Sequence, residues 1–299
     1  MAPGSPARAI GYDVSQSWNC RGVSKAVLPG FTAGYFSGAK PDAGALQFGS
    51  GPAFYLSSTG SDANSGTASQ PWKTWAHALK QLDPGETLLV KDGTYGTANG
   101  NGYPDIDCTQ GYKNGTASAP ITIKAENERR VSISATIGAG TALDISNCNY
   151  WTIEGLYLKG GDNASAATEP LDVNYSNYIR LRRLLIEYNN RYFNTHLLFL
   201  NHSNNILVED SEFYHFHRHA ILVYQSDNNV FRRNYFNSRG HADISGGYVS
   251  YYTDRGEAAI TPYPGNSNVM ENNISEGNGA ALDVVGTYAW GSDDNRVFG

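Results

Sequence analysis

Histidine is concentrated in one short stretch of this sequence. The segment HFHRH, from His215 to His219, holds three of the chain's seven histidines together with Arg218. Imidazole changes its charge nearest to neutral pH, so a histidine cluster can transfer protons or bind a metal ion. Which of these a given histidine can do depends on the elements that hold it, and a fourth histidine, His196, becomes relevant once those elements are placed.

Carboxylates recur in a second pattern, in which Leu-Asp is followed by Ile or Val. The pattern includes Asp144 and Asp172 and recurs at Asp283. Two carboxylates held about 5 Å apart repel each other unless a cation bridges them or one keeps a proton. Asp144 and Asp172 could therefore bind Ca²⁺, the one cofactor that the sequence suggests, or act as the carboxyl pair of a retaining glycosidase. A row of solvated aspartates on an exposed face is the third interpretation, and the sequence favours it.

The elements that position these residues can be inferred first from composition. Apolar residues make up 40% of the 299 positions, and 33 Gly with 20 Tyr are typical of a chain rich in strands and turns. The 22 basic and 28 acidic residues give a net charge of −6, and no basic stripe suited to nucleic acid is present in the sequence. No apolar run approaches the roughly 18 residues of a membrane span. We expect a β-rich globular protein.

A repeat of about 25 residues organises the second half of the chain. Large apolar anchors follow one another at separations of 28, 27, 23, 38 and 28 residues, namely Ile153, Leu181, Val208, Phe231, Val269 and Val297. Five residues after the first five anchors stand Leu158, Ile186, Phe213, Phe236 and Ile274. Apolar pairs spaced two apart also precede the first four anchors by ten and eight positions, as expected for short strands with one buried face.

Stacking of these units explains how they fold. A unit of this length has no helix long enough for a crossover and cannot bury its apolar residues alone, whereas coils stacked about 4.8 Å apart can. Charges support the stacking, because the positions after the anchors read Glu154, Arg182, Glu209 and Arg232, which alternate in sign. We predict an all-β fold, a parallel β-helix, and interpret these arginines as partners in a charge ladder.

The stacking aligns a row of candidate catalytic residues. Twelve residues before the anchors stand Thr141, Glu169, His196, His219 and Glu257. His196 and His219 would then be stacked neighbours flanked by carboxylates, an arrangement suited to general acid–base catalysis or to a metal site, while a row of hydrogen-bonded rim residues is the plainer interpretation. His215 and His217 fall in the preceding turn, where solvent-facing positions are expected.

The parts outside the repeat suggest further features. Ser69 to about residue 83 has a helical pattern that could cap the first coil, and residues 1–51 form an extension of uncertain structure. The long interval before Val269 predicts a loop insertion at about 239–256 that overhangs the histidines. Candidate substrate-binding residues are Glu169, Arg239, His241, Tyr251, Tyr252, Arg255 and Glu257. The chain ends on an anchor, so the last coil of the 52–299 helix appears incomplete, which predicts chain continuation or self-association there.

The run FYLSSTGSDANSGTASQPWKTWAHALKQLDPGETLLVKDGTY, followed by APITIKAE and Asn-rich coils, resembles the opening of secreted right-handed parallel β-helix proteins. This group contains polysaccharide lyases of the pectate, alginate and chondroitin type and uronan epimerases. The resemblance covers roughly Phe54 to the end of the chain. It implies a right-handed helix, an extracellular or cell-surface location and a polysaccharide partner, and it selects no catalytic residues.

The leading hypothesis is a polysaccharide lyase that acts by β-elimination on an acidic, uronate-containing polysaccharide. Elimination needs a group that neutralises the uronate, a base for the C5 proton and a proton donor for the leaving oxygen. We assign proton transfer to His219 and His196 and the uronate carboxylate to Arg218. A glycoside hydrolase that uses Asp144 with Asp172, or Glu169 with Glu257, is the second hypothesis, and a non-catalytic glycan-binding adhesion protein is the third. Whether Cys108 and Cys148 are bonded is left open.

Overall fold

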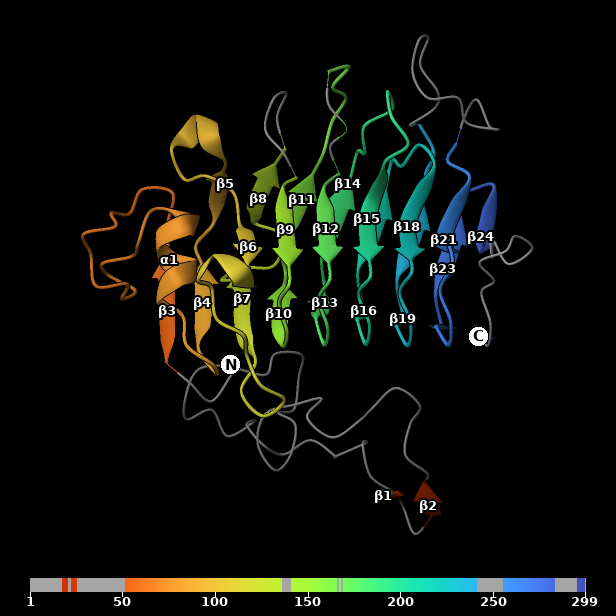
Figure 1. Cartoon of the computed structure of the whole chain (residues 1–299), viewed down its shortest axis with the longest axis horizontal. Helices are drawn as coiled ribbons and strands as arrows, with labels where there is room; N and C mark the ends of the chain where they lie inside the picture. Colours follow the sequence, from red (N-terminus) through yellow and green to blue (C-terminus); the bar gives the residue numbers. More distant parts are fainter. Residues whose placement is uncertain are drawn as a thin grey trace.

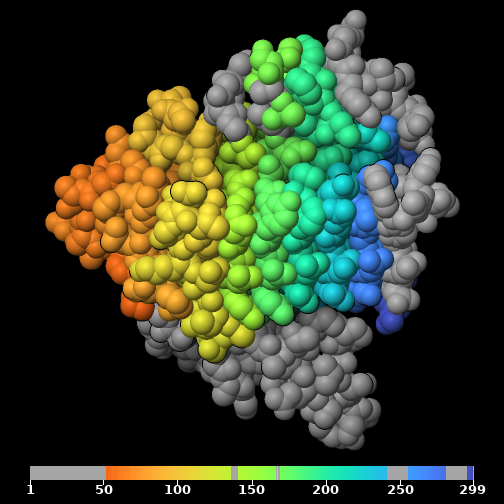
Figure 2. All heavy atoms as spheres, in the orientation of Figure 1, coloured from red at the N-terminus to blue at the C-terminus, as the bar shows by residue number. Residues whose placement is uncertain are grey.

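The structure is a computed structural model that describes residues 52–135, 141–165, 167, 169–240, 255–280 and 295–298, together with the backbone of 18–20, 23–25, 281 and 282. Its main body is a stack of coils whose strands form three parallel sheets (Figure 1). Viewed as spheres, the coils follow one another as colour bands across the molecule (Figure 2). The predicted parallel β-helix is confirmed.

The strands of each coil occur in the order sheet 1, sheet 2, sheet 3. Sheet 1 consists of β3 (Ala53–Leu56), β4 (Thr87–Val90), β7 (Ile121–Ala125), β10 (Trp151–Glu154), β13 (Arg180–Arg182), β16 (Leu207–Glu209), β19 (Val230–Arg232), β22 (Val269–Glu271) and β25 (Arg296–Phe298). Sheet 2 consists of β5 (Gly93–Tyr95), β8 (Val131–Ser134), β11 (Tyr157–Lys159), β14 (Leu185–Glu187), β17 (Glu212–Tyr214), β20 (Tyr235–Asn237) and β23 (Ile274–Glu276). Sheet 3 consists of β6 (Asp105–Asp107), β9 (Leu143–Ser146), β12 (Leu171–Asn174), β15 (His196–Asn201), β18 (His219–Tyr224), β21 (Ala258–Pro262) and β24 (Ala280–Leu282). The coils from β4 to β24 contribute one strand to each sheet, whereas β3 and β25 extend only sheet 1.

Strand pairing confirms most of the predicted register. Ile153 pairs with Leu181, Leu181 with Val208, and Val208 with Phe231 in sheet 1, and all four side chains are buried. The column also extends to earlier coils, where Ile153 pairs with Ile123. Inward columns of apolar residues from the three sheets form one continuous core.

The register after the long insertion was predicted one residue too early. Phe231 pairs with Met270, and Val269 is not the buried anchor. In sheet 2 the same slip places Ser275 opposite Phe236 and leaves Ile274 56% exposed. Because side chains alternate between the faces of a strand, a shift of one residue moves a predicted core residue to the surface.

The predicted charge ladder exists and is buried. Lys124 Nζ lies 2.9 Å from Glu154, Arg182 Nε lies 2.6 Å from Glu209, and Arg232 Nη2 lies 2.9 Å from the same Glu209 carboxylate. Neighbouring positions in the sheet therefore carry opposite charges, as cross-strand pairing favours. Glu271 is the strand partner of Arg232 and continues this ladder in the next coil.

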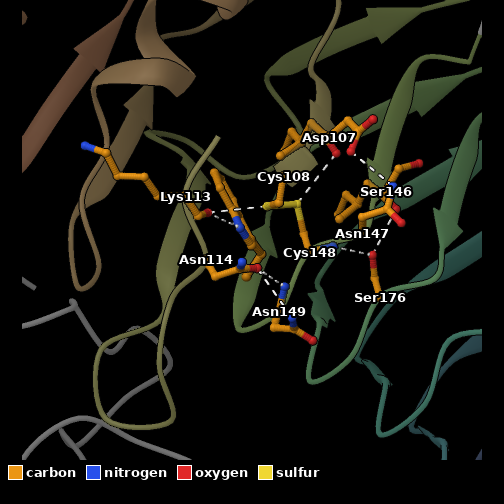
Figure 3. The surroundings of a disulfide bond; sticks show 12 residues. Asp107, Cys108, Lys113, Asn114, Ser146, Asn147, Cys148, Asn149 and Ser176 are labelled. Carbon is orange, nitrogen blue, oxygen red and sulfur yellow. Dashed lines mark hydrogen bonds between the residues drawn. A yellow bond between two sulfur atoms is a disulfide. The ribbon is translucent and has the colours of Figure 1, made fainter. Parts of the chain in front are cut away.

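Polar columns hold the turns between sheet 3 and sheet 1. The backbone N–H of Ser176 donates to Ser203 Oγ, and that of Ser203 donates to Ser226 Oγ, at 3.1 and 2.9 Å. Cys148 occupies the equivalent position one coil earlier and donates its N–H to Ser176 Oγ (Figure 3). Its sulfur is bonded to Cys108, so a disulfide joins this column to the preceding coil.

The α-helix of the described residues, α1 (Trp75–Gln81), lies at the N-terminal end of the stack (Figure 1). The side chain of Thr74 accepts the N–H of His77 at its start, and Trp75 and Leu79 are buried in the core. The helix is shorter than the predicted 69–83 segment because Asp62 binds the backbone N–H groups of Lys73 and Thr74, which fixes the preceding residues as a loop.

Short elements complete the described chain. These are the 3-10 helices η1 (Thr97–Asn99) and η2 (Cys108–Gln110) and an antiparallel pair, β1 (Trp18–Cys20) and β2 (Val23–Lys25). Among the described residues, no helix combines the length and the apolar character needed to cross a membrane.

Candidate functional site

A row of carboxylates crosses the first coils on the outer face of sheet 3. Asp105, Asp144 and Asp172 are direct partners on the adjacent strands β6, β9 and β12. Their neighbours along the strands, such as Ile145 and Val173, are buried in the core, so alternation directs the aspartates outward. Glu169, two residues before β12, hydrogen-bonds Asp172. We call Asp105, Asp144, Asp172 and Glu169 the acidic strip.

Asp144, Asp172 and Glu169 retain protons more readily than isolated carboxyls do. Burial, followed by the charges of Asp172 and Asp105, raises the pKa of Asp144 to about 6, although Ser146 and Asn174 donate hydrogen bonds to it. Burial and the adjacent Asp172 charge raise the pKa of Glu169 well above its usual range. Burial also raises the pKa of Asp172, which accepts a hydrogen bond from Thr141. The strip can therefore supply protonated and ionised carboxyls side by side.

A cavity of about 630 Å³ opens at the first part of the strip. Asp105, Asp144 and Thr141 line it together with Tyr103 and Tyr112. Both tyrosines are partly exposed, and rings in such positions commonly contact sugar faces. We call this cavity the tyrosine groove. Its polar and aromatic lining suits a carbohydrate better than an apolar ligand.

The predicted histidine pair is present but buried. His196 and His219 are strand partners whose rings stack 5.2 Å apart, yet they are only 3% and 5% exposed. Burial, and then the neighbouring charges of His219 and Arg218, holds the pKa of His196 well below its usual range. His196 is therefore neutral at physiological pH and lies within the wall of the coil.

The remaining histidines of the HFHRH segment also have structural surroundings. His217 is fully buried, so the expectation of a solvent-facing position was wrong for it, and its N–H donates to Asn189. His215 is partly exposed and stacks on Tyr188 with ring centroids 4.5 Å apart. The turn is thus fixed by packing against the preceding coil.

Arg218 and Glu257 form an ion pair beside the histidines. Arg218 Nε lies 3.1 Å from Glu257 Oε2, and His219 Nε2 lies 3.5 Å from the same oxygen. Glu257 was predicted as the strand partner of His219, but Ala258 holds that position because of the one-residue slip after the insertion. Arg218 thus pairs with the carboxylate of Glu257, whereas the sequence assigned it to the carboxylate of a uronate.

Of the seven candidate substrate-binding residues, His241, Tyr251 and Tyr252 lie outside the described residues. Arg239 is exposed at the start of the insertion, and Arg255 is partly buried at its end. The roles assigned to these residues stay predictions.

Within the described ranges, no group of three or more His, Cys, Asp or Glu side chains is placed to hold a metal ion. Asp144 and Asp172 are adjacent, as predicted, but each is already hydrogen-bonded to neighbouring side chains. The assignment of Ca²⁺ to this pair stays a prediction.

Sequence reasoning missed Asp105 and the two groove tyrosines. The signal was available, because Asp105-Ile106 repeats the Asp-Ile and Asp-Val pairs at Asp144 and Asp172. The coil between Asp105 and Asp144 spans 39 residues, so the counting that began at Ile153 did not reach it.

Known proteins share this architecture. A rhamnogalacturonan lyase superposes with a TM-score of 0.53 and 14% identity over 83% of this chain and 63% of its own length. A GH136 lacto-N-biosidase from Eubacterium ramulus gives 0.50 and 15% over 83% and 56%. The protein YwoF of Bacillus subtilis (strain 168) is 35% identical over 86 residues, which are 29% of this chain and 16% of that protein. The chain thus spans less than two thirds of each of these proteins.

The model of one protein family, described as "Pel9A-like, right handed beta helix region", matches residues 54–278. The match extends over all three sheets and includes the acidic strip and the histidine pair. The predicted right-handed β-helix and the resemblance to polysaccharide lyases of this type are confirmed at the level of the fold. This chain belongs to the Pel9A-like right-handed β-helix family.

Proposed function

We propose that this protein is a carbohydrate-active enzyme that cleaves a polysaccharide at the acidic strip. The observation that carries the proposal is Asp144, whose pKa is raised to about 6 between Asp105 and Asp172 at the tyrosine groove. A carboxyl with such a pKa can protonate the leaving oxygen of a glycosidic bond near neutral pH. Tyr103 and Tyr112 would hold the sugar rings beside it.

β-Elimination on an acidic polysaccharide is the first candidate reaction, because lyases share this fold and the strip retains protons. A base removes the C5 proton, a C4–C5 double bond forms, the C4–O bond breaks, and Asp144 protonates the departing oxygen. Protonated Glu169 or Asp172 would donate hydrogen bonds to the uronate carboxylate as negative charge develops on it. The exposed Asp105 is the candidate base.

This assignment moves the proposed proton transfer away from the histidines. His196 and His219 are buried, and Arg218 is paired with Glu257. The three residues lie in the coils that follow the strip.

Hydrolysis is the second candidate reaction, and one specific observation favours it. Asp105 and Asp144 are direct partners on parallel strands, whose spacing of about 4.8 Å is close to the roughly 5–5.5 Å between the carboxyls of retaining glycosidases. Asp144 would then be the acid–base residue and Asp105 the nucleophile. We expect a protein that acts on such a polymer to work outside the cell or at the cell surface.

Product analysis tests the proposal and separates the reactions. The protein is incubated with polygalacturonate, alginate, chondroitin and neutral polysaccharides, each with Ca²⁺ and with a chelator. Ultraviolet absorbance from unsaturated sugar ends indicates elimination, whereas new reducing ends without that absorbance indicate hydrolysis. Binding without any product from the whole panel would overturn the proposal in favour of a glycan-binding protein.

A further inference from the structure

A second cavity lies on the loops that follow sheet 2, away from the tyrosine groove. Its volume is about 310 Å³, and its lining consists of Lys159, Asp162, Tyr188, Arg191 and three glycines at positions 160, 161 and 240. Lys159 is the last residue of β11, and Tyr188 directly follows β14 (Figure 1). We call this cavity the lysine pocket. It is large enough for one charged sugar substituent and too small for a polymer segment.

The cations of the lysine pocket differ in their partners. Asp162 binds Arg191 through the guanidinium, with Nη2 2.6 Å from Oδ2, and also accepts the Arg191 backbone N–H. This carboxylate therefore neutralises Arg191 and fixes its side chain at the rim. The net charge of the titratable lining is +1, from Lys159 and Arg191 against Asp162.

Lys159 is positioned without a carboxylate partner in the described part of the chain. Its Nζ lies 4.9 Å from the centroid of the Tyr188 ring, a cation–π contact that orients the ammonium group. Glu187 is its strand partner, but that carboxylate is bound by the Tyr157 hydroxyl and by His215. The ammonium group therefore remains available to an anionic ligand that enters the pocket.

The lysine pocket and the acidic strip lie at opposite ends of one loop. Residues 160–170 connect Lys159, at the end of β11, to the start of β12, and Glu169 lies near the end of this connection. Above about pH 6 Asp144 is ionised and repels an ionised carboxylate, whereas Lys159 attracts one. A glycan with acidic groups would therefore place one of them in the pocket while another sugar unit occupies the strip.

We propose that the lysine pocket is a binding subsite for the carboxylate of an acidic sugar unit other than the one that reacts. This inference rests on the proposed function only for the identity of the polymer. Lys159, with Arg191 fixed beside it, would bind this second carboxylate, which is distinct from the carboxylate of the reacting uronate that the sequence assigned to Arg218.

Binding to two forms of one polymer tests the pocket directly. Polygalacturonate and its methyl ester share a backbone and differ in charge, and affinity electrophoresis in the Asp144→Asn background avoids cleavage during the measurement. Lys159→Met is expected to weaken binding of polygalacturonate about tenfold and to leave the methyl ester unchanged. Lys159→Arg should retain most of the affinity.

Lys91→Met is the matched control, because Lys91 also lies over a tyrosine ring, that of Tyr55, on another sheet. It should bind both polymers like the parent. Unchanged polygalacturonate binding by Lys159→Met, or equal loss for both polymers, would overturn the proposal. Displacement of the polymer by acetate at the same carboxylate concentration would also overturn it, since the pocket would then bind free anions rather than a sugar.

Kinetics separate the failure of this inference from that of the proposed function. In the otherwise unaltered protein, Lys159→Met should raise KM for an acidic polymer and leave kcat nearly unchanged. Cleavage with an unaltered KM would overturn the proposal that the lysine pocket is a subsite and would leave the proposed activity of the acidic strip intact. Lys159-dependent binding without cleavage of any polymer would overturn the catalytic proposal and leave the pocket.

Discussion

Neighbouring ionisable residues have opposite charges in sheet 1 and the same charge in sheet 3. In sheet 1 the charge ladder alternates, so that Glu209 is fully buried between Arg182 and Arg232 and is paired with both. In sheet 3 the acidic strip stacks Asp105, Asp144 and Asp172 at the same spacing and with the same sign. The two rows belong to the same stack of coils, so coil geometry does not account for the difference.

The difference indicates which row serves the fold and which serves another purpose. Alternating charges stabilise neighbouring strands, whereas like charges on direct partners destabilise them. The strip lowers this cost by retaining protons, as the raised pKa of Asp144 shows. A row that violates local pairing and lines a cavity is a candidate functional site, because proteins tolerate such conflicts mainly where activity depends on them.

The largest effect is expected from breaking the ladder. Glu209→Gln removes one buried charge and leaves Arg182, Arg232 and Arg233 with a neutral partner. We expect the free energy of unfolding to fall by about 3–5 kcal/mol, because the buried Arg232 loses the carboxylate 2.9 Å away and retains Glu271 at 3.9 Å. Urea denaturation measures this loss, and activity at low temperature should persist because the ladder lies on another sheet. A loss below about 1 kcal/mol would show that the ladder is not essential to the fold.

A substitution in the acidic strip is expected to lower activity and leave the free energy of unfolding intact. Asp144→Asn removes the proposed proton donor and should lower kcat about 100-fold or more, without lowering the free energy of unfolding, because Asn resembles the protonated carboxyl. Initial rates on the best polymer of the panel provide the measurement. Ser146→Ala is a matched control, because it removes a hydrogen bond to Asp144 and keeps the carboxyl. Full activity of Asp144→Asn would refute the assignment.

A pH series sharpens the comparison, because the folded-state pKa of Asp144 is raised above that of the unfolded chain. The proton on Asp144 therefore stabilises the folded protein at low pH, and this contribution is lost as pH rises from about 4 through about 6. Relative to Asp144→Asn, the parent should lose about 1–3 kcal/mol of unfolding free energy across that interval. Thermal unfolding of both proteins at matched pH values measures the difference. Parallel curves would mean that the pKa of Asp144 is not raised.

The sequence predicted the ladder better than the strip because their coils differ in regularity. From Ile153 to Phe231 the units have similar lengths, so counting aligned Glu154, Arg182 and Glu209 correctly. Asp105 lies before a coil of 39 residues, where a fixed period fails. The sequence pattern also could not predict which outer side chains are buried. His196 and His219 were aligned correctly, but their burial depends on the packing of the neighbouring coils.

The lysine pocket illustrates a further limit of sequence reasoning. Lys159 ends β11 and pairs with Glu187, so the repeat places Tyr188 near it, whereas Asp162 and Arg191 come from the loops that follow β11 and β14. The repeat does not determine the path of these two loops. Periodicity predicts which residues stack in columns, whereas a pocket between loops requires the three-dimensional path of each connection.

The smallest effect is expected from Ile274→Thr, which tests the one-residue shift in register after the insertion. Ile274 is 56% exposed, whereas Phe236 in the preceding coil is fully buried and pairs with Ser275. Ile274→Thr should change the unfolding free energy by less than about 0.5 kcal/mol, because little apolar contact is lost at an exposed strand position. Phe236→Ala, in comparison, should cost about 3–5 kcal/mol. Urea denaturation of the two variants separates the registers, since a loss of more than 2 kcal/mol in Ile274→Thr would return Ile274 to the core and restore the register that the sequence alone suggested.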